Sequence, residues 1–286
     1  MTQTYGVRSM AGSLRRVAVR PVAPSTTAET FTGAHWLDTP DLARLATQHD
    51  ALLGTLRSAG VEVEVLPTHA DLADSCFVYD PVFVTGRGAI VLQQVKPART
   101  GEPPHLEGEL AELGIPIIGR LTGDAVADGG DMFWLDDTTL AVGRGYRTNA
   151  AAHEQLRAIL AEEGAEVVSF DLPHDQGPDA CLHLMSVISP VDRDLAVVYE
   201  PLAPVALLQA LAERGIEYVA VDPEEYVRLA SNVLAIGPRH VVMFAGSPQT
   251  VAALEAHGVR VEVIEADQFV LGEGGPTCLT RPLWRE

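Results

Sequence analysis

The amino-acid sequence predicts an α/β fold of five similar strand–strand–helix–strand units, arranged around an axis as a five-bladed propeller. The first observation is a recurring signature, in which a leucine stands four residues before a glycine and a short run of branched apolar residues follows. The glycines of its five copies are Gly60, Gly114, Gly164, Gly215 and Gly258, at steps of 54, 50, 51 and 43 residues. The second observation is that most copies follow two apolar runs separated by turn-forming residues. A single unit of this kind cannot bury its apolar faces, so we expect the five units to close into a ring.

Each element of the unit has a mechanical reason. The leucine packs on the last helical turn, and the glycine takes the left-handed position that ends a helix. The residues that follow alternate in polarity or are branched, which is typical of a strand. Ahead of the helix we expect a hairpin of two strands, at residues 81–93, 132–143, 184–200 and 232–245. No Ser/Gly-rich linker interrupts the units, so we expect one catalytic domain over residues 1–286.

The composition excludes several classes of function. The 286 residues include 39 Asp and Glu against 20 Lys and Arg, which gives a formal net charge of −19. Nucleic-acid binders need clustered cations and anionic membranes repel negative charge, so we expect neither partner. No apolar run has the length of a membrane-spanning helix, and the segment MTQTYGVRSMAGSLRR has no signal-peptide core. These features predict a cytoplasmic enzyme.

Four segments carry side chains that ordinary turns do not need, at residues 74–80, 127–131, 181–186 and 272–280. In the last of them Cys278 follows a Gly-Gly-Pro turn, and a thiol becomes a strong nucleophile when its pKa is lowered or a base is near. His183 lies in an apolar strand pattern, and Asp128 stands at a glycine-rich turn from which it can orient a histidine. If the ring brings distant units together, these three residues form a nucleophilic constellation.

Each of these residues also has a purely structural interpretation. A cysteine is more often buried and inert, a histidine in an apolar pattern more often fills the core, and an aspartate such as Asp128 or Asp131 more often caps a turn. Cys76 and Cys181 lie in apolar runs, and we expect both in the core. No cluster of His, Cys or Asp has the spacing of metal ligands and no phosphate-binding glycine loop is present, so we expect neither a metal nor a cofactor.

The combined motifs resemble the guanidine-modifying pentein superfamily, and most closely the dimethylarginine dimethylaminohydrolases. The resemblance runs from about residue 15 to residue 286. It is carried by the segment from Asp74 to Asp80 with FVYDPVFV, and by ADGGD at 127–131, VGRGYRTN at 142–149, LHLMS at 182–186 and GGPTCLT at 274–280. It implies a five-bladed α/β propeller that hydrolyses methylated arginine to citrulline and an alkylamine.

The resemblance also implies roles for the three candidate catalytic residues. Cys278 would attack the guanidinium carbon and form a covalent thiouronium intermediate as the amine leaves. His183 would protonate the leaving amine and then activate water, with Asp128 as the acid that partners the histidine.

A second set of residues resembles the substrate contacts of the family. Asp74 and Asp80 would hold the guanidinium, because fixed carboxylates match a planar cation with several N–H donors. Glu273 resembles an acidic substrate contact, and Arg147 resembles the arginine that binds the substrate α-carboxylate. Arg99 is matched more loosely to a second such arginine, and for both arginines a solvated surface position is the alternative.

The sequence departs from the family at points that bear on substrate choice. Tyr79 stands where dimethylargininases often carry a charged residue, and the Asp80-Pro81 pair and the Gly-Gly-Pro before Cys278 lean towards arginine deiminases. Arginine deiminases, however, are usually longer. We expect residues 31–45, here called the flap segment, to cover the site, with His35 and Trp36 touching the substrate.

Several alternatives stay open. The chain could hydrolyse arginine itself or another guanidine or ureido compound, or it could transfer an amidino group. It could also be a ligand-binding or ribosome-associated ring without activity, although such relatives usually lose part of the set Cys278, His183 and Asp128. The expected partner is a small guanidine, and the resemblance allows a homodimer.

Overall fold

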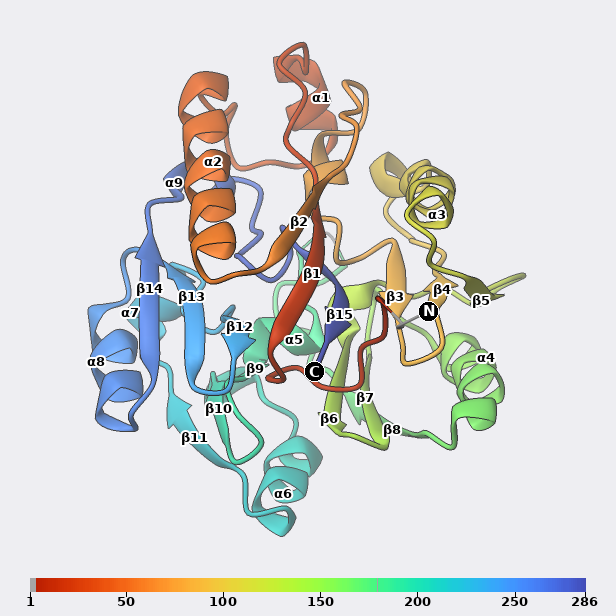
Figure 1. Ribbon diagram of the computed structural model, residues 1–286, viewed down its shortest axis with the longest axis vertical. Coiled ribbons are helices and arrows are strands. Elements are labelled where there is room, and N and C mark those ends of the chain that lie inside the picture. The colour runs from red at the N-terminus through yellow and green to blue at the C-terminus, as the bar shows by residue number, and fades with distance from the viewer. Residues whose placement is uncertain (1–3, 179) are drawn as a thin grey trace.

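The computed structural model describes residues 4–178 and 180–286, which form five three-stranded sheets around a central axis (Figure 1). In chain order four sheets consist of β3 (Val82–Val84), β4 (Ala89–Val91) and β5 (Ile117–Arg120); β6 (Met132–Asp136), β7 (Thr139–Arg144) and β8 (Glu166–Asp171); β9 (Ile188–Pro190), β10 (Leu195–Val198) and β11 (Glu217–Ala220); and β12 (Leu234–Gly237), β13 (His240–Phe244) and β14 (Arg260–Ile264). In every sheet the middle strand pairs antiparallel with one neighbour and parallel with the other. The predicted strand–strand–helix–strand unit and the propeller are therefore confirmed.

The fifth sheet joins the two ends of the chain. Its strands are β15 (Arg281–Arg285), β1 (Leu14–Val19) and β2 (Glu62–Val65). Strand β15 runs antiparallel to β1, with Leu14 opposite Arg285. The unit that contains Gly60 has no hairpin of its own in the sequence, and the C-terminal strand supplies the missing partner, which closes the ring.

One longer helix connects the parallel strands of each sheet and lies on the outside of the ring (Figure 1). These helices are α2 (Leu42–Ser58), α3 (Glu102–Glu112), α4 (Ala150–Leu160), α6 (Val205–Glu213) and α8 (Pro248–Ala256). Four short helices, α1 (Ala28–Gly33), α5 (Leu184–Val187), α7 (Pro223–Tyr226) and α9 (Asp267–Val270), lie in the loops between strands. Among the residues that the structure describes, no helix combines the length and apolar character needed to cross a membrane.

The repeated leucine and glycine do what the sequence predicted. All five glycines have a left-handed backbone, with φ between 66° and 81°. In each unit the N–H after the glycine donates to the carbonyl of the repeated leucine, over 2.9–3.3 Å, and this is the Schellman arrangement that ends a helix. The leucines Leu56, Leu110, Leu160, Leu211 and Leu254 are at most 1% exposed. The same sequence pattern therefore builds the same helix end and the same core contact five times.

One predicted hairpin differs from the structure. Residues 184–187, expected to lie in the first strand of the hairpin at 184–200, form the short helix α5 instead. The N–H groups at its start are held by side chains, because His183 N donates to Ser186 Oγ and Leu184 N donates to Asp131 Oδ1. His183 therefore stands at a helix N-terminus and not inside a strand.

Candidate active site

Two cavities meet where the predicted nucleophile lies. The larger has a volume of about 260 Å³ and the smaller about 40 Å³. Four residues line both of them: Cys181, His183, Glu273 and Cys278. A concave site lined by a thiol, an imidazole and carboxylates is a candidate active site.

Cys278 stands in the loop between α9 and β15 and is partly exposed. Asn232 Nδ2 donates to its Sγ over 3.2 Å, and Asn232 Oδ1 accepts from the backbone N–H of Thr277 over 3.0 Å. A Cβ at Gly275 would lie 2.4 Å from Asn232 Cγ, so only glycine lets this loop approach the amide. The Gly-Gly-Pro turn therefore allows Asn232 to hold the thiol in place.

The thiol is neutral in the free protein. Burial, and after it the negative charge of Asp80, raise the pKa of Cys278 to about 11. A thiolate at this position therefore needs a positive charge brought beside it.

His183 lies at the junction of the two cavities and contacts Asp128, a buried residue that lines neither of them. His183 Nε2 lies 3.0 Å from Asp128 Oδ2, and both side chains are buried. Burial lowers the pKa of His183, but Cys181, Asp80 and Asp128 outweigh that effect and raise it well above its usual value. The ring is therefore cationic and able to donate a proton.

The Ala-Asp-Gly-Gly-Asp segment fixes the position of the histidine. A Cβ at Gly130 would lie 2.4 Å from His183 Nδ1, so the backbone must be glycine for the ring to pack there. Asp131 accepts from Leu184 N over 2.8 Å and from Thr148 Oγ1 over 2.6 Å. Asp131, at first interpreted as a turn residue, therefore fastens the start of α5 and with it His183.

The predicted guanidinium-binding carboxylates both line the smaller cavity, where each is paired with a protein cation. Asp74 accepts from Trp36 Nε1 over 2.7 Å and from Lys96 Nζ over 2.6 Å. Asp80 accepts from Gly130 N over 2.8 Å and from Arg99 Nη1 over 2.6 Å.

Arg99 is buried and its three guanidinium nitrogens already donate to protein acceptors. They bind Asp80 and Glu102 and the carbonyls of Asp74 and Phe77. This geometry makes Arg99 a support for Asp80. Arg99 also lines the smaller cavity, and its Nη1 has a second N–H besides the one given to Asp80, so the predicted contact with a substrate carboxylate stays a prediction.

Arg147 is placed differently. It lines the smaller cavity, and its Nη1 lies 3.5 Å from Asp128 Oδ2. Its Nε is buried and finds no hydrogen-bond partner among the described residues. A buried donor without a partner costs about 1–3 kcal/mol, so an anionic ligand that reached this N–H would be favoured.

The flap segment runs along both cavities. His35 lines the smaller cavity and Leu37 the larger one, while Leu37 N donates to Leu271 O over 2.8 Å. Trp36 is buried and reaches Asp74, as described above.

Three residues at the site were not assigned to it from the sequence. The prediction that Cys181 lies in the core is wrong, because its segment is irregular and places Sγ 3.7 Å from His183 Nδ1, whereas Cys76 is fully buried as predicted. Asn232 carried no motif. Lys96 could have been noticed in the sequence, because it is the only lysine there.

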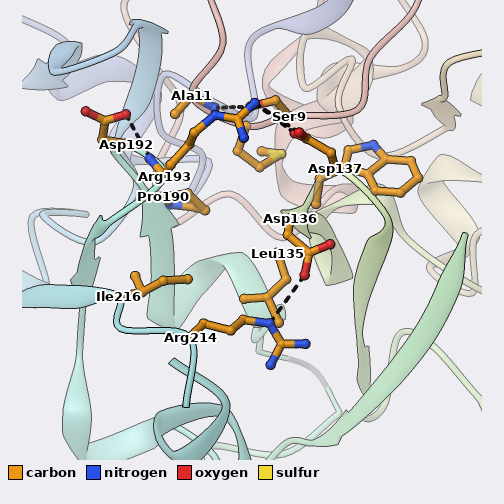
Figure 2. A pocket seen from close by; sticks show the side chains of 12 residues that line it. Ser9, Ala11, Leu135, Asp136, Asp137, Pro190, Asp192, Arg193, Arg214 and Ile216 are labelled. Carbon is orange, nitrogen blue, oxygen red and sulfur yellow. Dashed lines mark hydrogen bonds and ion pairs between the residues drawn. The ribbon is translucent and has the colours of Figure 1, made fainter. Parts of the chain in front are cut away.

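A third cavity lies at the other end of the strands. Figure 2 shows it between Asp136 and Asp137, at the end of β6, and three residues of the next unit: Pro190 at the end of β9, Arg193 in the loop after it and Arg214 just after α6. Strand β6 begins beside Asp128 and ends here, so this cavity faces away from Cys278. Its described lining contains neither cysteine nor histidine, and Arg193 and Arg214 are paired with the two aspartates. This described lining therefore lacks the thiol and the imidazole that the candidate active site combines.

The described residues contain no group of three or more His, Cys, Asp or Glu side chains arranged to hold a metal ion.

Comparisons with known proteins agree with the motifs. The family model for N,N dimethylarginine dimethylhydrolase of eukaryotes matches residues 38–285. An N(G),N(G)-dimethylarginine dimethylaminohydrolase of Streptomyces coelicolor is 30% identical over 233 residues, which cover 82% of this chain and 83% of that protein. The enzyme of the same name from Pseudomonas aeruginosa is 26% identical over 250 residues, covering 87% and 92%.

Solved structures share the fold. A variant of the dimethylarginine dimethylaminohydrolase of Pseudomonas aeruginosa, in complex with citrulline, superposes with a TM-score of 0.81 at 24% identity and covers 94% of this chain and 99% of that one. The product-bound N-terminal domain of ArgZ, an arginine dihydrolase of cyanobacteria, gives a TM-score of 0.82 at 19% identity, covering 96% and 98%.

Proposed function

The chain belongs to the dimethylarginine dimethylaminohydrolase family, whose members hydrolyse guanidino C–N bonds, and from this premise we propose that it hydrolyses N-methylated arginine to citrulline and an alkylamine. The observation that carries the proposal is that Cys278 and His183 both line the junction of the two cavities, with Asp128 bonded to His183. The ring that brings them together closes only through the pairing of β1 with β15, which supports one catalytic domain over the whole chain.

In the proposed reaction the substrate activates its own nucleophile. The Cys278 thiol has a pKa of about 11, and a guanidinium placed beside Sγ favours the thiolate by its positive charge, so the thiol proton is lost to water. The thiolate then attacks the guanidinium carbon. Protonated His183 gives a proton to the leaving amine and afterwards takes one from the water that hydrolyses the thiouronium intermediate.

The smaller cavity suits the amino-acid part of arginine. The buried Nε–H of Arg147 has no partner among the described residues and can donate to the α-carboxylate, and Lys96 is a second cation that lines the same cavity. We assign Asp74 and Glu273, which line the same cavity, to the α-ammonium group, and Asp80 to the guanidinium. Arg99 acts by holding Asp80 in place.

A substrate panel tests the proposal. Purified protein is incubated separately with asymmetric dimethylarginine, monomethylarginine and arginine, and citrulline, alkylamine and ammonia are measured. We expect citrulline with an equal amount of alkylamine from the methylated substrates, and its loss in Cys278→Ser. Cys76→Ser removes a buried thiol that lines neither cavity and is the control. Citrulline from arginine alone would replace the proposal with an arginine deiminase activity, and no turnover of any guanidine would favour a ring without catalytic function.

A further inference from the structure

We propose that the larger cavity receives the N-substituent of the leaving amine, and that the enzyme accepts N-alkylarginines whose substituent is several carbons longer than methyl. This inference rests on the proposed function, because it assigns the larger cavity to one part of the substrate that the proposed function names.

The position of the reacting atoms decides which part of a substrate enters which cavity. Attack by Cys278 places the guanidinium carbon at Sγ, where the two cavities meet. One nitrogen of the guanidinium leads to the amino-acid part, and another becomes the leaving amine. All Lys and Arg residues among the described lining residues of the two cavities, namely Lys96, Arg99 and Arg147, line the smaller one, so the amino-acid part with its α-carboxylate lies there. The leaving amine then faces the larger cavity, past His183.

The residues that line the larger cavity suit an apolar substituent. Its apolar wall consists of Leu37, Met185, Tyr226, Val227, Leu229 and Val270. No lysine or arginine is among its described lining residues, and its charged groups besides His183 are the acids Asp175 and Glu273. Such a wall favours hydrocarbon, and its acids disfavour a substituent that ends in a carboxylate.

The size of the cavity exceeds what methyl groups need. Its volume of about 260 Å³ is more than six times that of the smaller cavity, which takes the polar part. Two methyl groups on the leaving nitrogen would contact only the part of the wall next to Cys278 and would leave the remote part unfilled. Among the lining residues Leu37 and Val227 are 68% and 67% exposed, so apolar surface remains to be covered by a longer chain.

The chemistry is unchanged for a longer substituent. The Cys278 sulfur forms a bond to the guanidinium carbon, the bond from that carbon to the substituted nitrogen breaks, and His183 protonates this nitrogen. Water then supplies the ureido oxygen and releases the sulfur. Guanidinium and water give citrulline and an alkylammonium ion, so atoms and charge balance.

Three substrates of matched design test the inference: Nω-methylarginine, Nω-butylarginine and Nω-(3-carboxypropyl)arginine. The second and third have substituents of equal chain length and differ in the terminal charge. We expect kcat/KM for the butyl compound to equal or exceed that for the methyl compound, with a gain of up to about fourfold for each methylene that the wall covers. The carboxypropyl compound should be at least about tenfold poorer than the butyl compound. A butyl value below the methyl value, or equal values for the butyl and carboxypropyl compounds, would overturn the inference.

A rim variant localises the effect. Val227→Trp fills the mouth of the larger cavity, and we expect it to lower the butyl-to-methyl ratio of kcat/KM by about tenfold. Val205→Trp changes a valine that is 71% exposed on α6, outside both cavities, and should leave the ratio unchanged. An unchanged ratio in Val227→Trp would show that the substituent does not lie in this cavity.

Binding to Cys278→Ser separates this inference from the proposed function. Calorimetric Kd values need no turnover, so they report on the cavity even if no guanidine is hydrolysed. Butylarginine that binds at least as tightly as methylarginine supports the cavity assignment alone. Weaker binding of butylarginine, with turnover of methylarginine intact, overturns the assignment and leaves the proposed function standing.

Discussion

Lys96 Nζ lies 2.6 Å from Asp74 Oδ2 and at the same distance from the carbonyl oxygen of Ala34, to both of which it donates. The other oxygen of Asp74 accepts from Trp36 Nε1. Asp74 and the only lysine of the chain therefore fasten the flap segment (residues 31–45) over the smaller cavity. Asp74, which was predicted to bind the substrate guanidinium, therefore holds the flap segment in place.

Lys96→Met should weaken substrate binding more than it slows the chemical step. The change removes a charge-assisted bond to the flap segment and leaves Asp74 without its cation, an effect of about 1.5–3 kcal/mol, so we expect KM to rise by about 10- to 100-fold with a smaller change in kcat. Steady-state kinetics with methylarginine measure both constants. Arg260→Met, at a side chain that is 73% exposed, is the control. A fall in kcat alone would contradict the role given to Lys96.

Ligand protection of the same lysine gives an independent measurement. Because the chain has one lysine, acetylation of a side-chain amine reports on Lys96 alone. We expect citrulline or methylarginine to slow this acetylation, as followed by mass spectrometry of the peptide. An unchanged rate at saturating ligand would mean that the ligand does not bind at the smaller cavity.

Alkylation of Cys278 in the free protein should be slow at neutral pH and should keep rising through alkaline pH. With a pKa of about 11 the thiolate fraction grows about tenfold for each pH unit below that value, so the rate with iodoacetamide should show no plateau between pH 7 and 10. Asn232→Ala removes a donor to the sulfur and should slow the reaction further. Peptide mass spectrometry separates Cys278 from Cys181. A plateau near pH 8 would show that the thiol is already activated before substrate binds.

The sequence could predict the parts of the fold that depend on neighbouring residues. The leucine and glycine of each unit determine a helix end through a hydrogen bond between residues five positions apart. All five helix ends could therefore be predicted from the sequence. The pairing of β1 with β15 was not predicted, because it joins the two ends of the chain and leaves no local pattern. The same reason explains α5, whose first N–H groups depend in part on Asp131, more than fifty residues earlier.

The candidate site shows the same division. Cys278 and Asp128 stand in motifs whose glycines are needed for close packing, so they could be chosen as candidates. His183 was chosen from the motif LHLMS, and the structure places it beside Asp128 at the junction that Cys278 also lines. Asn232 and Cys181 reach that junction only through the fold. Arg99 could be chosen as a candidate from its place in the sequence, but its ion pairs with Asp80 and Glu102 could not be predicted from sequence spacing.

Two glycine substitutions should separate stability from activity. Gly164→Ala forces a left-handed backbone (φ 66°) on alanine in open space, so it should lower the free energy of unfolding by about 1–2 kcal/mol and leave kcat unchanged. Gly130→Ala places a Cβ 2.4 Å from His183 Nδ1, so it should displace the ring and lower kcat by about 100-fold or more. Denaturant unfolding and steady-state kinetics on both variants give the comparison. Equal losses of kcat in the two variants would contradict the positioning role of Gly130.

His49 should make the fold sensitive to acid. The ring is buried in α2 beside Phe269, its Nε2 has no partner among the described residues, and burial lowers its pKa to about 4. In the unfolded chain the pKa is about 6.5, so below that value protons bind the unfolded state preferentially. The stability that the neutral ring contributes is fully present above pH 6.5 and is lost as the pH falls towards 4, by about 3 kcal/mol in total.

The variant His49→Leu should remove this part of the pH dependence. We expect the free energy of unfolding of the wild type to fall between pH 7 and pH 4 by about 3 kcal/mol more than that of His49→Leu, whatever the difference between the two proteins at pH 7. Thr47→Leu, on the exposed side of the same helix, adds a leucine without removing a titratable group and should keep the wild-type slope. Denaturant titrations at four pH values measure the slopes. If His49→Leu and the wild type lost stability in parallel, the buried imidazole would not be the group that binds the proton on unfolding.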